Sequence, residues 1–121
     1  MDFVNNQHKH LAQGRWKQFS FAEQMGNIGS EIERTIHWKE KGNPEYSNLA
    51  FERALELIDL TIDNAKTGPR LRELTRTREA LVDHFVFSNE YHTTDECWKK
   101  YFFCFAFAAQ VRRSIRVNRL T

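Results

Sequence analysis

The segment from Trp98 to Phe107 constrains the fold more than any other part of the chain. It holds six aromatic residues within ten positions. Because successive residues of a helix turn by about 100°, one face would carry Trp98, Tyr101, Phe102, Phe105 and Ala109, and the other side Phe103, Phe107 and Val111. A helix that is apolar nearly all round has to be covered on more than one side. The segment therefore predicts either the central helix of a bundle or a helix whose second face packs on another subunit.

Periodic apolar residues predict an all-α fold with four helices. Apolar residues recur at three- and four-residue spacing over residues 18–42, 46–65, 69–87 and 93–117. Helices of this length with short connections favour an up-and-down four-helix bundle, and 121 residues suffice for one such domain, residues 18–121. Residues 1–17 lack the periodicity and are predicted to form a loose N-terminal arm, which Trp16 could pin to the core.

Three signals mark where the predicted helices begin. Ser20 followed by Glu23 fits a capping box, in which a hydroxyl and a carboxylate each satisfy a free backbone amide. Pro69 follows Thr67-Gly68 and suits the first turn of a helix. Thr93, with Glu96 three residues later, predicts the cap of the last helix.

Two glycines interrupt the first predicted helix. Gly26 and Gly29 each cost about 0.8–1 kcal/mol of helix stability relative to alanine. An interior glycine therefore indicates a close neighbour, either the backbone of another helix or a large phenylalanine. Phosphate binding by residues 26–30 is the alternative, but it requires the start of a helix, and this stretch lies in the middle of one.

Charge is unevenly spread along the chain. Residues 99–121 carry a net charge of +6, and residues 1–98 carry −4. The basic end contains Arg112, Arg113, Arg116 and Arg119. One interpretation of these arginines is a basic patch that binds nucleic acid, anionic lipid or an acidic protein. The other is that they are cations favoured by the dipole at a helix C-terminus.

The sequence contains few signs of a disulfide, a membrane span or a metal site. Cys97 and Cys104 are interpreted as buried reduced thiols of a cytoplasmic protein. No apolar run approaches the roughly 20 residues of a membrane span. A di-metal bundle needs Glu-x-x-His on two helices, whereas Glu33 and His37 are four residues apart and Glu79 and His84 five. Neither a metal site nor a cofactor is predicted.

Arg78 interrupts the apolar stripe of the third predicted helix. A guanidinium at such a position either extends to solvent or pairs with a carboxylate. Glu31 and Glu56, at the margins of their own stripes, are the candidate partners for a buried ion pair. An anion site inside the bundle is the functional alternative.

Arg78 and His84 also form an Arg-x5-His pattern. It resembles the Arg-x4-6-His motif of HEPN-type helical bundles, many of which are ribonucleases or partners of nucleotidyltransferases. The resemblance implies that His84 moves a proton from a ribose hydroxyl and that Arg78 stabilises phosphate charge. Glu79 follows the arginine, where such bundles commonly carry Asn, Asp or His.

Longer strings resemble a second family. They are residues 27–31, 52–57, 76–79 and 101–103, and they are similar to those of small uncharacterised bacterial helical proteins of about 120 residues. This resemblance implies a compact bundle and no established activity. The aromatic last helix itself leads to the functional prediction, which is a non-enzymatic cytoplasmic accessory or binding protein that self-associates through this helix, most simply as a twofold dimer. The HEPN-like ribonuclease or nucleotidyltransferase partner and the nucleic-acid-binding module are the alternatives.

Overall fold

The described part of the chain consists of helices and their connections. The computed structural model describes residues 13–65 and 67–120, with side chains through residue 118. The four long helices are α2 (Phe21–Glu40), α3 (Pro44–Ala65), α4 (Pro69–Phe85) and α5 (Asp95–Leu120). No strand occurs within these ranges, so the all-α prediction is confirmed. Most of the predicted arm, residues 1–12, lies outside the described residues.

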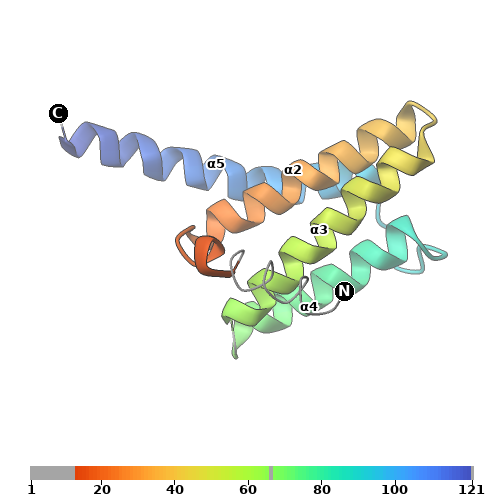
Figure 1. Cartoon of the computed structure of the whole chain (residues 1–121), viewed down its shortest axis with the longest axis horizontal. Coiled ribbons are helices and arrows are strands. Elements are labelled where there is room, and N and C mark those ends of the chain that lie inside the picture. The colour runs from red at the N-terminus through yellow and green to blue at the C-terminus, as the bar shows by residue number, and fades with distance from the viewer. Residues whose placement is uncertain (1–12, 66, 121) are drawn as a thin grey trace.

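Helix α2 holds the central position. It packs against α3 on one side and against α5 on the other, while α4 packs on α3. Figure 1 shows the helices running back and forth in sequence, with the last turns of α5 projecting past the start of α2. The first of the two alternatives for the aromatic helix, that α5 is the central helix of the bundle, is therefore wrong.

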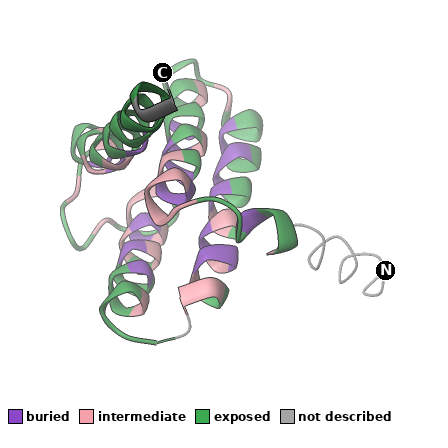
Figure 2. Cartoon of the chain, turned by 90° about the vertical axis from the view of Figure 1, so that its left-hand side faces the viewer, coloured by how far each residue is buried: buried purple, intermediate pink, exposed green. Residues whose placement is uncertain are grey.

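All four helices contribute to one hydrophobic core. Its buried members are Met25, Ile28, Ile32 and Ile36 of α2, Phe51, Ala54 and Ile58 of α3, Leu74 and Leu81 of α4, and Trp98 and Phe102 of α5. Figure 2 shows these buried faces turned inward, whereas residues 110–118 of α5 are all exposed. Tyr101 links α5 to α4, because its hydroxyl lies 3.1 Å from Thr77 Oγ1 and donates to Glu73 Oε1 at 2.8 Å.

The helix starts follow the sequence signals, with one correction. The capping box is present, since Ser20 Oγ accepts from the Glu23 amide and Glu23 Oε1 accepts from the Ser20 amide. Gly68 precedes Pro69 with a φ of 92°, a conformation that favours glycine. Helix α5, however, is capped by Thr94, whose Oγ1 accepts from the Cys97 amide at 3.1 Å. The predicted cap, Thr93, instead bonds to side chains of the α4–α5 junction.

Both interior glycines of α2 face α5 at close range. A Cβ at Gly26 would lie 3.5 Å from the Ala106 Cα atom, and a Cβ at Gly29 would lie 2.5 Å from Phe102 Cβ. The prediction of a neighbouring helix backbone or a large phenylalanine is thus confirmed, once for each glycine. These two positions set how closely α5 approaches α2.

Trp16 fixes the chain that precedes α2. Its ring is buried, and its Nε1 donates to Thr61 Oγ1 at 2.9 Å. Gln24 Nε2 donates in turn to the Trp16 carbonyl at 2.9 Å. The expectation that Trp16 pins part of the N-terminal region to the core is confirmed for this residue.

Candidate functional site on the last helix

The side of α5 that faces away from α2 carries a continuous apolar stripe. Phe103, Phe107, Val111 and Ile115 are exposed by 64%, 59%, 40% and 48%. We call these four residues the outer stripe. The rings of Phe103 and Phe107 stack with centroids 6.2 Å apart. The sequence predicts the first three members on this side. Ile115 was missed, although it continues the same four-residue step.

Both cysteines lie on the surface. Cys97 and Cys104 are exposed free thiols, so their interpretation as buried residues is wrong. The interpretation assumed that α5 is covered all round, and the chain itself covers only one side. Cys104 directly follows Phe103 and therefore lies next to the outer stripe.

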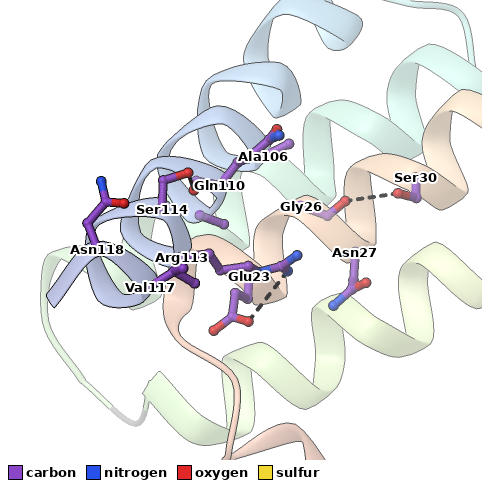
Figure 3. A pocket seen from close by; sticks show the side chains of 11 residues that line it. Glu23, Gly26, Asn27, Ser30, Ala106, Gln110, Arg113, Ser114, Val117 and Asn118 are labelled. Carbon is purple, nitrogen blue, oxygen red and sulfur yellow. Dashed lines mark hydrogen bonds and ion pairs between the residues drawn. The ribbon is translucent and has the colours of Figure 1, made fainter. Parts of the chain in front are cut away.

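A groove runs between the first half of α2 and the second half of α5. It has a volume of about 590 Å³, and Gly26 and Ser30 line it on one side and Ala106 and Gln110 on the other. Figure 3 shows Glu23 and Arg113 pointing toward each other across it. Their carboxylate and guanidinium are 3.7 Å apart.

Glu23, the acidic residue of this groove, is held in its charged form by its neighbours. The backbone amide of Ser20 holds the pKa of Glu23 below its usual value, and the charges of Arg113 and Arg116 lower that pKa further. The predicted basic end is therefore partly neutralised by a residue of α2. Arg112 and Arg116 are exposed, and the side chain of Arg119 lies outside the described residues. A charge count by segment could not reveal the contribution of Glu23.

His84 belongs to a buried network at the junction of α4 and α5. Its side chain is only 7% exposed. Nε2 lies 2.8 Å from Asp95 Oδ1, and Nδ1 lies 3.0 Å from Thr93 Oγ1. Trp98 Nε1 also donates to Thr93 Oγ1, at 3.2 Å. Both ring nitrogens of the histidine are thus occupied by residues that fix the start of α5.

Asp95 is held in its charged form by this network. Burial alone would raise the pKa of Asp95, but the hydrogen bond with His84 and the charge of Lys39, 3.5 Å away, lower it overall. The network therefore combines a hydrogen bond and an ion pair at the first residue of α5. The sequence singles out His84 but not its partners, because Thr93 matches the pattern of a helix cap.

Arg78 pairs with a carboxylate that the sequence did not indicate. Its Nε lies 2.9 Å from Asp59 Oδ1, and the two side chains are 38% and 49% exposed. The predicted buried partners are wrong, because Glu31 pairs with Arg34 and Glu56 is exposed. An arginine this exposed reaches the margin of α3 without burying its charge.

The structure does not bring Arg78 and His84 together. Arg78 bonds to α3, and His84 bonds to the start of α5.

Within the described ranges, no group of three His, Cys, Asp or Glu side chains is placed to hold a metal ion. None of the helices in the described part of the chain is long and apolar enough to cross a membrane.

Comparisons with known proteins found no match to this chain. No family model matches the chain, and no curated protein or solved structure matches it. What the chain does has to be inferred from its own surfaces, of which the outer stripe is the most distinctive.

Proposed function

We propose that this protein is a non-enzymatic up-and-down four-helix bundle that self-associates through the outer stripe of α5 and serves as an accessory or binding subunit. The observation that carries the proposal is the uncovered stripe of Phe103, Phe107, Val111 and Ile115. Single exposed apolar residues are ordinary on protein surfaces. A continuous row on one helix face is typical of an interaction surface.

The spacing of the stripe supports a second copy of the chain as its partner. Its members follow one another at four-residue steps over about 18 Å of helix. Such i±4 ridges interdigitate with the same ridge of another helix at a crossing angle of about −50°. The contact is self-complementary, as a twofold dimer requires.

The charges near the stripe also suit a crossed arrangement. Lys99 and Lys100 lie on α5 before the stripe, and Arg112 and Arg116 lie on a different side of its C-terminal half. Two antiparallel helices packed side by side along their length would bring these basic ends together. A crossing centred between Phe107 and Val111 keeps them apart. The contact is small for a stable dimer, so we expect association that weakens on dilution.

Analytical ultracentrifugation over a range of concentrations tests the proposal. We expect a monomer–dimer equilibrium for the wild type and at least a tenfold weaker association for Phe107→Ser. Phe87→Ser is the matched control, because Phe87 is also exposed but lies in the α4–α5 connection. A wild type that stays monomeric at every concentration, or a control as impaired as Phe107→Ser, would contradict the proposal.

The two native thiols provide an independent readout. Cys104 lies beside the stripe, whereas Cys97 lies about 10 Å further toward the start of α5. In a crossed dimer, alkylation of Cys104 should slow as protein concentration rises, while Cys97 should react at a constant rate. Each thiol is compared with itself, so their different intrinsic reactivities do not matter. Equal protection of both would argue against a crossing at Phe107 and Val111.

A further inference from the structure

A second concave site lies away from the outer stripe, where the start of α2, the end of α3 and the start of α4 meet. It is a cavity of about 410 Å³. Sites for small molecules generally fall between about 300 and 1,000 Å³. Its lining combines cationic, amide and aromatic side chains.

Two cationic side chains are among the described residues that line this cavity. Lys17 comes from the chain before α2, and Arg70 comes from the first turn of α4. None of the described residues that line it is an Asp or a Glu. Within the part of the chain that the structure describes, neither cation forms an ion pair. Their positive charge is therefore available to a ligand.

Arg70 is held in place by an aromatic ring. Its guanidinium carbon lies 4.3 Å from the centroid of Phe21. Phe21 packs in turn edge-on against Phe105, with centroids 5.8 Å apart, and both rings belong to the margin of the core. A stacked guanidinium keeps its N–H edges free for the paired hydrogen bonds that carboxylates and phosphates accept.

A buried amide donor in the same cavity has no acceptor. Asn64 lines the cavity from the last turn of α3, and its Nδ2 is buried with no hydrogen-bond partner among the described residues. Buried polar groups are nearly always paired, so an orphaned donor on a residue that lines the same cavity as two cations points to an acceptor supplied by a ligand. The start of α4 adds positive potential, because it has no side-chain cap and no acidic residue in its first turn.

We propose that this cavity binds a small organic anion. Arg70, Lys17 and the Asn64 amide hold its carboxylate or phosphate group, and its apolar part lies against Phe19 and Phe21. The carboxyl end of α3 offers a competing reason for cations here, since its dipole attracts them. That reason leaves the Asn64 donor unsatisfied, and it predicts no response to added anions.

Thermal unfolding and calorimetry with phenyl phosphate and inorganic phosphate, at matched ionic strength, test this site. We expect phenyl phosphate to raise the melting midpoint of the wild type, as a ligand of the native state must, and to bind more tightly than inorganic phosphate. Arg70→Gln should bind at least tenfold more weakly. Arg76→Gln is the matched control, because Arg76 is an exposed arginine of α4 that does not line the cavity.

A second variant protects the test against loss of stability. Asn64→Asp places a negative charge where the orphaned donor lies, and it should abolish binding even in protein that calorimetry shows to be folded. Absence of any response in the wild type, or an equal response in Arg70→Gln and the wild type, would overturn the proposal. Equal affinity for the two phosphates would overturn the role assigned to Phe19 and Phe21. The outer stripe takes no part, so these results are independent of self-association.

Discussion

Both sides of α5 carry large aromatic residues, but the two sides have opposite surroundings. On the inner side, Trp98 and Phe102 are buried in the core shared by all four helices. On the outer side, Phe103 and Phe107 stack on each other and remain uncovered. The sequence therefore shows that both sides of α5 are apolar. Only the packing of the helices shows that the chain covers one side and leaves the other exposed.

The adjacent residues Phe102 and Phe103 test the difference between the two sides of α5 most directly. Phe102 is 3% exposed and Phe103 is 64% exposed. We expect Phe102→Ala to lower the free energy of unfolding by about 3–5 kcal/mol, because it leaves a cavity in the core. Phe103→Ala should change the free energy of unfolding of the monomer by less than about 0.5 kcal/mol. Urea unfolding at low protein concentration measures both, and similar losses would show that the two sides do not differ.

The glycines of α2 test how tightly the inner side is packed. A Cβ at Gly29 would overlap Phe102, so Gly29→Ala should destabilise the protein by about 1–3 kcal/mol. At Gly26 the nearest atom is at ordinary contact distance, so Gly26→Ala should stabilise it by up to about 1 kcal/mol through helix propensity. Thermal unfolding of the two variants should give shifts of opposite sign. A stabilising Gly29→Ala would mean that α5 moves away from α2 at little cost.

The sequence predicted the inner side of α5 well because periodicity reports which residues share a face. The same reasoning located the close approaches at Gly26 and Gly29, since an interior glycine needs a packing reason. Periodicity did not predict which side chains pair between helices, because that depends on the register of one helix along the next. Arg78 meets Asp59 rather than Glu31 or Glu56, because the offset of α4 along α3 decides which carboxylate lies within reach.

The candidate sites were harder to predict than the fold. The outer stripe followed from spacing, but its exposure depended on which helix is central. The cavity beside Arg70 joins residues from three segments, and no local pattern links Lys17, Asn64 and Arg70. The network around His84 likewise joins α4 to the start of α5 through Thr93 and Asp95.

Acid titration gives the smallest expected effect and tests how the inner side of α5 is anchored at its first residue. The pKa of Asp95 is lowered in the folded state, so its charge stabilises the fold above the usual aspartate pKa of about 3.9, and that stability is lost as the pH falls through the lowered value. Asp95→Asn should therefore be less stable than the wild type at pH 6, by about 1 kcal/mol or less because the aspartate is partly exposed. The difference should shrink below pH 4. Glu96→Gln is the control, because it removes a charge from the same helical turn. Glu96 is largely exposed, and its carboxylate lies 3.7 Å from the Lys99 ammonium. Chemical unfolding of this variant should therefore give a free energy close to that of the wild type at both pH values. If the two variants lose stability equally at pH 6 and regain it equally in acid, the helix dipole rather than the His84 contact accounts for the effect of Asp95.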